Sequence, residues 1–290
     1  MLWFLTQVCF ARDYTVILQS DDYPQYEIPA LSFLENSDQT TKRYQLHGKK
    51  ERAEQFGQSL AEDPPPLVVA FGAKAAWTAQ KYLPDVPLLY AMVENPARYG
   101  IEGPNTYGIS MIVPQDLTLS QLRFLIPDLN KIGLIASPSY PKSLLEETKQ
   151  IAGALGIETE YLIYSDSKDL RKNSNKLQNV NALWLLPDQD LISNNFFYTL
   201  SDLTIRARIP LLTSSAALTE AGSLLGIVPD LNAIGIQASE SAALFFENQA
   251  PEKIQAPLEA QVILNKKTQQ QIGIDFSEDE LSFIHQEVGY

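Results

Sequence analysis

The second half of the chain repeats one pattern, in which short apolar segments alternate with helix-like stretches and end in small polar loops. The apolar segments are residues 131–136, 160–164, 181–186, 209–212 and 224–228. This alternation is typical of a parallel α/β sheet, whose strands are buried on both faces and joined by helices. Such sheets bind small ligands at the carboxyl ends of their strands. We therefore expect an α/β protein with a ligand site.

The first half of the chain continues this pattern. Residues 14–19 are rich in β-branched and aromatic side chains and predict the first strand. Three prolines at positions 64–66 end an amphipathic helix, because proline cannot continue one, and the apolar segments 67–71 and 88–92 follow as strands. The whole chain thus predicts two doubly wound, Rossmann-like parallel sheets.

These sheets divide the chain into two expected lobes. A length of 290 residues with 45% hydrophobic content suggests about two domains. We expect lobe 1 to comprise residues 12–113 plus 214–258, because the segment 226–230 begins a strand and helix that fit this lobe. Lobe 2 then comprises residues 114–213 plus 259–290. The chain would cross between the lobes three times, which makes a three-crossover hinge beside a ligand cleft.

Charge and residue content exclude several function classes. The formal net charge of -13, without a basic run, argues against a nucleic-acid partner, because phosphate contacts need clustered Lys and Arg. The chain has one cysteine, Cys9, and two histidines, His47 and His285. We therefore expect no internal disulfide, no His- or Cys-based metal site and no cofactor, while an all-oxygen metal site stays open. We also expect a monomer.

The N-terminal segment resembles the end of a secretory signal. Residues 2–11 are apolar, precede the polar pair Arg12-Asp13, and are too few to span a bilayer. Cys9 and Ala11 would occupy the −3 and −1 positions of a cleavage site. We expect residues 1–11 to be a signal-peptide remnant, and the mature protein to be periplasmic or otherwise extracytoplasmic. The segment lacks a basic stretch, and the alternative is an amphipathic first strand or helix.

The loops that follow the predicted strands carry the candidate ligand-binding side chains, because the carboxyl ends of parallel strands meet at one edge of a sheet. The candidates are Ser20, Asp21, Tyr23, Gly72, Ala73, Lys74, Glu94, Asn95, Ser137, Ser139, Tyr140, Asp188, Gln189, Thr213 and Ser214.

Two of these loops belong to the first half of the chain. Gly72 precedes a helix, whose free N–H groups suit an anion, and Lys74 adds a positive charge; the alternative is a tight turn with a solvated lysine. Glu94 suits a ligand ammonium, and Asn95 can cap the helix that begins at Pro96.

The other loops also have structural alternatives. Ser139 or Tyr140 could cap a helix that begins at Pro141, and Ser214 lies at a predicted crossover, so it is a hinge or a ligand-site residue. We expect Trp184, on an apolar face, to pack in the core.

No catalytic motif is present. The chain contains no G-x-S-x-G, no H-E-x-x-H and no Cys–His pair, so we expect a protein that is not an enzyme. The alternative is an enzyme that uses Asp, Glu or Lys alone.

The order of several segments points to a family. Residues 68–77, 87–96, 107–110, 131–157 and 265–274 follow one another as in the solute-binding proteins of ABC transporters. The chain resembles the group that contains tryptophan- and phenylalanine-binding lipoproteins, over residues 13–288. The individual motifs are short, so their order and spacing carry the match.

The resemblance implies a type I flytrap, in which two lobes close on a small polar ligand and then dock on an ABC permease for import. The alternative is a periplasmic subunit that senses a ligand and signals to a membrane kinase or cyclase. The chain departs from the family at two loops. The family often has Thr or Ser where this chain has Ala73, and Asp-Pro where this chain has Glu94-Asn95-Pro96. These departures leave the ligand's identity open.

Overall fold

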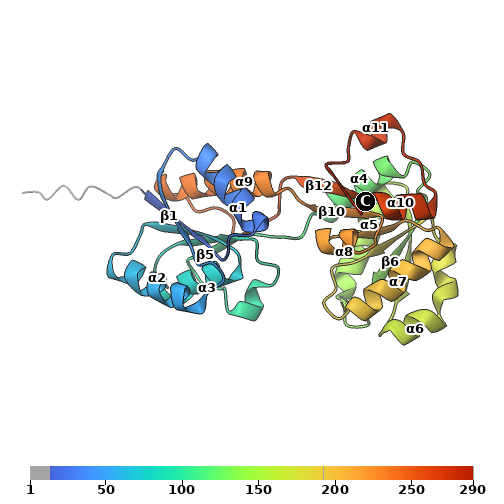
Figure 1. Cartoon of the computed structure of the whole chain (residues 1–290), viewed down its shortest axis with the longest axis horizontal. Coiled ribbons are helices and arrows are strands. Elements are labelled where there is room, and N and C mark those ends of the chain that lie inside the picture. Colours follow the sequence, from blue (N-terminus) through green and yellow to red (C-terminus); the bar gives the residue numbers. More distant parts are fainter. Residues whose placement is uncertain (1–13, 192, 290) are drawn as a thin grey trace, which may run out of the picture. The chain divides into compact units, whose positions relative to one another are not determined.

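The computed structural model describes residues 14–191 and 193–289, which form two compact units (Figure 1). Unit 1 contains the residues up to Met111 together with Leu231–Leu258, and unit 2 contains Ile112–Asp230 and the residues from Glu259 onward. The chain therefore passes from one unit to the other three times. The expected signal segment, residues 1–11, lies outside the described residues.

Unit 1 is built on a six-stranded sheet of order β11-β5-β4-β3-β1-β2, in which all neighbouring strands are parallel. The strands are β1 (Tyr14–Gln19), β2 (Thr40–Gln45), β3 (Leu67–Phe71), β4 (Leu88–Ala91), β5 (Thr106–Ile109) and β11 (Ile254–Gln255). All residues of β1, β3 and β4 are buried, as expected for strands between two helical layers. Gln19 pairs with Phe71 and Phe71 with Ala91, so three strands end at the same edge.

Helices cover both faces of this sheet (Figure 1). They are α1 (Pro24–Asn36), α2 (Lys50–Glu62), α3 (Ala73–Tyr82), α9 (Leu231–Phe246) and the short 3-10 helix η1 (Pro96–Tyr99). Successive strand residues point to opposite faces. Leu18 and Ala70 thus join the core under α2 and α3, whereas Ile17 and Val69 join the core under α1 and α9.

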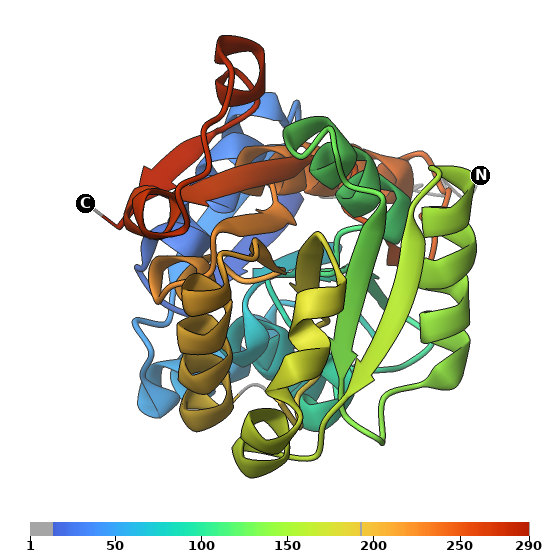
Figure 2. The same ribbon diagram turned by 90° about the vertical axis from the view of Figure 1, so that its right-hand side faces the viewer.

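Unit 2 is built on a seven-stranded sheet of order β13-β12-β10-β9-β8-β6-β7. The strands are β6 (Lys131–Ala136), β7 (Glu158–Ile163), β8 (Ala182–Leu185), β9 (Leu211–Thr213), β10 (Leu225–Pro229), β12 (Ala260–Asn265) and β13 (Gln286–Val288). Five strands run parallel, β12 is antiparallel to β10, and β13 is parallel to β12. Figure 2 shows β6 and β7, drawn in green, side by side.

Two cores, one on each face, hold the unit 2 sheet to its helices. The helices are α4 (Gln115–Leu125), α5 (Lys142–Ala154), α6 (Ser167–Lys172), α7 (Asn194–Ala207), α8 (Ala216–Glu220), α10 (Lys266–Ile272), α11 (Glu278–Leu281) and the 3-10 helix η2 (Ser174–Asn179). Leu134 and Trp184 pack in one core with residues of α4 and α5. Ile135 and Leu185 pack in the other core with residues of α6 and α7.

The predicted fold class of two α/β units with parallel sheets is confirmed. The predicted return of the chain to the first lobe at residue 214 is wrong. Residues 214–230 form α8 and β10, and β10 pairs with β9 and β12 in the unit 2 sheet. The error has a physical cause, because an apolar strand such as β10 suits the interior of either sheet and only its pairing partners decide between them.

Candidate functional site

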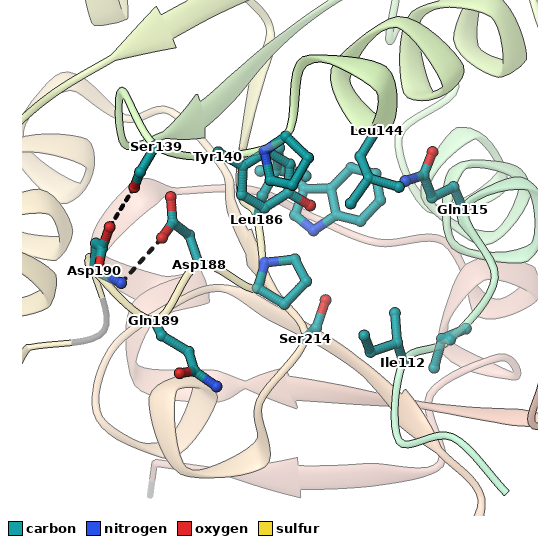
Figure 3. Close-up of a pocket in the computed structure, with 14 residues that line it drawn as sticks. Ile112, Gln115, Ser139, Tyr140, Leu144, Leu186, Asp188, Gln189, Asp190 and Ser214 are labelled. Carbon is teal, nitrogen blue, oxygen red and sulfur yellow. Dashed lines mark hydrogen bonds between the residues drawn. The ribbon is translucent and has the colours of Figure 1, made fainter. Parts of the chain in front are cut away.

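A cavity of about 380 Å³ lies in unit 2 at the carboxyl ends of β6, β8 and β9 (Figure 3). These strands are parallel neighbours, so the loops that follow them meet at one edge of the sheet. The β6–α5 loop, the segment after β8, Ser214 after β9 and the segment that leads into α4 line the cavity. A volume of this size is within the range for small-molecule sites.

The polar side of the cavity is a hydrogen-bonded loop pair. Asp188 is only 5% exposed, and its two carboxylate oxygens accept hydrogen bonds from the backbone N–H of Ser137 (2.6 Å) and of Asp190 (3.0 Å). The Ser139 hydroxyl lies 2.8 Å from the Ser137 hydroxyl and donates to the exposed Asp190 carboxylate. Asp188 therefore holds two loops together, while Asp190 presents a negative charge at the surface of the cavity.

The other side of the cavity is mainly apolar. Leu144 and Ile112 lie across the cavity from Ser139 and Asp190 (Figure 3). Ile112 is 55% exposed, so an apolar surface is available to a ligand. The Tyr140 ring packs against the core that contains Leu134 and Trp184. Burial raises the pKa of its phenol, and the negative charge of Asp188 adds to the rise.

Two hydrogen-bond donors belong to this apolar side. Trp184 is 2% exposed, and its indole N–H has no acceptor among the described residues. Gln115, at the start of α4, accepts a hydrogen bond of 2.7 Å from the Thr148 hydroxyl through its side-chain oxygen. Both side chains line the cavity.

In unit 1, the loops after β1 and β3 close tightly on each other. Ser20 is 6% exposed, and its hydroxyl accepts a hydrogen bond of 2.9 Å from the Ala75 N–H in the first turn of α3. Gly72 has φ +97°, and a Cβ at this position would lie 2.6 Å from the Ser20 hydroxyl and 2.6 Å from the Tyr26 ring. Only glycine fits this position without strain.

Charged groups surround the same edge of unit 1. The Lys74 ammonium donates to the backbone carbonyl of Gly48. Burial raises the pKa of Tyr26, and the negative charges of Asp21 and Glu94 add to the rise, so both carboxylates are within electrostatic range of its phenol. The predicted Asn95 cap is confirmed, because its side chain accepts from the Arg98 N–H at 3.2 Å.

The structure brings the candidate residues into two groups, one in each unit. Ser139, Tyr140, Asp188, Gln189 and Ser214 line the unit 2 cavity. The cavity does not include Ser137, which bonds Asp188 through its backbone, or Thr213, which is buried and bonds Ser215 O at 3.2 Å. The suggestion that Ser139 or Tyr140 caps α5 is wrong, because Pro141 holds the cap position without a side-chain hydrogen bond.

The remaining candidates, in unit 1, have individual positions. Tyr23 is 57% exposed at the start of α1, Ala73 is the first residue of α3, and Glu94 is exposed after β4. No finding tests whether any candidate residue contacts a ligand, so these assignments stay predictions.

Sequence reasoning missed several side chains of these edges, including the apolar Ile112 and Leu144 as well as Asp190, Gln115 and Tyr26. Asp190 follows two residues after Asp188, so extending the candidate loop would have found it. Gln115 is the first residue of α4. It was missed because the candidates were taken from loops that follow strands, and the segment before α4 was not among these loops. Tyr26 lies in the first turn of α1, after the loop that follows β1. Its ring lies beside Gly72, which is far away in sequence, so only the tertiary structure reveals this contact.

The site offers groups that can bind a ligand. No cluster of three or more His, Cys, Asp or Glu side chains that could hold a metal occurs within the described ranges. The unit 2 cavity is lined by carboxylates, hydroxyls, amides and apolar surface. Such a lining can hold a ligand that combines an apolar body with hydrogen-bonding and cationic groups.

The sequence of the chain matches a protein family and a named relative. A family model described as ABC transporter substrate binding protein matches residues 33–288. The "Tyrosine-binding protein" of Clostridioides difficile (strain R20291) is 22% identical over 240 residues, which cover 79% of this chain and 69% of that protein.

Solved structures share the fold. A ligand-free, open substrate binding protein with adhesive properties from Clostridium difficile superposes with a TM-score of 0.73 and 17% identity, over 96% of this chain and 100% of that one. The ABC domain from Streptococcus pneumonia in complex with L-Trp gives a TM-score of 0.55 and 20% identity, over 96% and 100% of the two chains. A conserved domain protein from Vibrio cholerae also gives 0.55, with 18% identity, over 95% and 99%.

Proposed function

This chain belongs to the ABC transporter substrate-binding protein family, and from that premise we propose that it captures an amino-acid-like ligand and delivers it to a membrane permease for import. The resemblance expected from segment order is confirmed. The family consists of solute-binding proteins, so the expectation of a non-enzymatic protein is also confirmed. The observation that carries the ligand class is the lining of the unit 2 cavity.

This cavity suits the ammonium and the side chain of an amino acid. Among the described residues, its lining includes Asp188 and Asp190 and no Lys or Arg. The Asp188 carboxylate is already bonded to two backbone N–H groups, so Asp190 is the group that pairs with a ligand ammonium. Leu144, Ile112 and the Tyr140 ring supply the apolar surface for the side chain. The names of two relatives, which mention tyrosine and L-Trp, favour an aromatic amino acid.

The carboxylate of the ligand needs a different partner, which we assign to unit 1. Helix α3 starts directly after Gly72. The Ala75 N–H of its first turn bonds Ser20, so the N–H groups of Ala73 and Lys74, with the partial positive charge of the helix, are the ones that suit an anion. A ligand that touches both units would be held between them and would favour the closed arrangement by its extra contacts there. Three chain crossings are compatible with such a hinge.

We propose that the protein works outside the cytoplasm, as ABC substrate-binding proteins do, after removal of residues 1–11. A search of residues 14–191 and 193–289 finds no helix with the length and apolar character of a membrane span.

The test is a thermal-shift screen of residues 12–290 against amino acids, sugars and nucleobases, followed by calorimetric titration of the compounds that raise the midpoint. We expect a saturable shift with aromatic amino acids, because a ligand at a hundredfold excess over its Kd stabilises the folded state by about 2.7 kcal/mol.

The matched variant is Asp190→Asn, which removes the charge at an exposed position. It should weaken amino-acid binding by about tenfold and leave the unfolding midpoint of the free protein unchanged. Stabilisation by sugars or nucleobases with no response to any amino acid would contradict the proposed ligand class.

A further inference from the structure

The apolar side of the unit 2 cavity contains a buried donor that the protein itself leaves unused. The Trp184 side chain is 2% exposed, and no described residue accepts a hydrogen bond from its indole N–H. Burying an N–H group without an acceptor is unfavourable, because its hydrogen bond to water is lost and not replaced. An acceptor supplied by a ligand in the cavity would remove this cost.

Gln115 places a second donor on the same side. Its side-chain oxygen accepts from the Thr148 hydroxyl, whose single proton is shared with the backbone carbonyl of Leu144, at 2.7 Å in each case. This bond orients the amide, so its NH₂ group is directed away from Thr148 and has no acceptor among the described residues. Figure 3 shows the amide nitrogen on the side of Gln115 that faces the other labelled cavity residues.

The two donors lie over the same face of the unit 2 sheet. Trp184 packs in the core that includes residues of α4 and α5, Gln115 is the first residue of α4, and Thr148 belongs to α5. The Asp190 carboxylate lies on the opposite side of the cavity (Figure 3). The cavity therefore has a carboxylate at one end and two hydrogen-bond donors within the apolar surface at the other.

We infer that Trp184 and Gln115 recognise an oxygen acceptor on the apolar side chain of the ligand, so that the protein selects a hydroxylated aromatic amino acid over its unhydroxylated analogue. The inference rests on the proposed amino-acid function and names the specificity pair of that site. A site built to bond a ligand hydroxyl rejects the analogue that lacks it, because the buried indole N–H of Trp184 then stays unpaired.

L-Tyrosine and L-phenylalanine are the matched probes, since they differ by one hydroxyl. Calorimetric titration of the full chain should give a Kd for L-tyrosine at least about tenfold below that for L-phenylalanine. Trp184→Phe, which keeps an aromatic ring, and Gln115→Leu should each reduce this preference by about three- to tenfold, through weaker binding of L-tyrosine. Trp77→Phe, in unit 1, should leave the preference unchanged.

The NMR signal of the Trp184 indole N–H distinguishes a lost hydrogen bond to the ligand from a general loosening of the core. The chain has three Trp residues, and the indole N–H signal of Trp184 is identified by its absence in the spectrum of Trp184→Phe. L-Tyrosine should move this signal downfield as the hydrogen bond forms, and L-phenylalanine should move it less.

Each outcome decides a different point. Equal affinity for the two probes, or an unchanged preference in both Trp184→Phe and Gln115→Leu, overturns the specificity pair while the amino-acid function stands. Failure of the unmodified protein to bind any amino acid overturns the proposed function and, with it, this inference.

Discussion

The carboxyl edges of the two sheets use their polar side chains in different ways. In unit 1, the Ser20 hydroxyl bonds the first turn of α3, and the Lys74 ammonium bonds the carbonyl of Gly48. In unit 2, Asp188 also ties loops together, but Trp184 and Gln115 present donors for which the described residues hold no acceptor. The same strand-end topology therefore produces one edge that is mostly self-bonded and one at which some donors have no acceptor among the described residues.

This difference separates two kinds of mutational effect. A polar group that is already bonded within the protein should affect stability more than affinity when it is removed, because its loss leaves a protein partner unpaired. A polar group that waits for a ligand should affect affinity more than stability. The following variants test the comparison in order of decreasing effect.

The largest loss should come from Gly72→Ala in unit 1. The positive φ of Gly72 and the 2.6 Å approach of Ser20 and Tyr26 to a new Cβ should together destabilise the protein by about 3 kcal/mol. The measurement is denaturant-induced unfolding. Gly100→Ala is the control, because Gly100 also has a positive φ of 65° but no atom within 4 Å of its Cβ position, so about 1 kcal/mol is expected. Equal losses would show that the tight approach of the loops is not important.

Asp188→Asn should have the next largest effect, although it changes only one atom. The new NH₂ group would face one of the two backbone N–H donors, from Ser137 and Asp190, and leave it without an acceptor. We expect a loss of about 2 kcal/mol in unfolding free energy. Asp190→Asn, at an exposed carboxylate, should cost less than about 0.5 kcal/mol. The assignment of Asp188 as the loop tie is wrong if the two variants are equally stable.

Lys74→Met should have the smallest effect and tests the comparison most directly. Loss of the hydrogen bond to Gly48 should lower stability by about 1 kcal/mol, and ligand affinity should change by less than about threefold. Lys49→Met, at a nearby exposed lysine, should change stability by less than about 0.5 kcal/mol. A fall of more than tenfold in affinity for Lys74→Met would mean that this lysine serves the ligand, and the contrast between the two edges would fail.

Much of the site could be predicted from single loops, because parallel strands end at one edge whichever sheet they join. The segments after β6 and β8 were therefore found, and five of the candidates line the cavity of unit 2. The role of each side chain could not be predicted in the same way. Asp188 and Asp190 look equivalent in sequence, yet one carboxylate is bonded to two backbone N–H groups and the other is exposed.

The alternation of apolar segments and helices, by itself, determined the α/β class, the parallel strands and the strand-end location of the cavity, because these depend on local hydrophobic patterning. The tertiary structure alone decided that β10 belongs to the unit 2 sheet, that Trp184 is both a core residue and a lining residue, and that Gln115 reaches the cavity. These features depend on pairing and packing between segments far apart in sequence. The local sequence around an apolar strand or a buried aromatic ring does not specify which distant segment will pack against it.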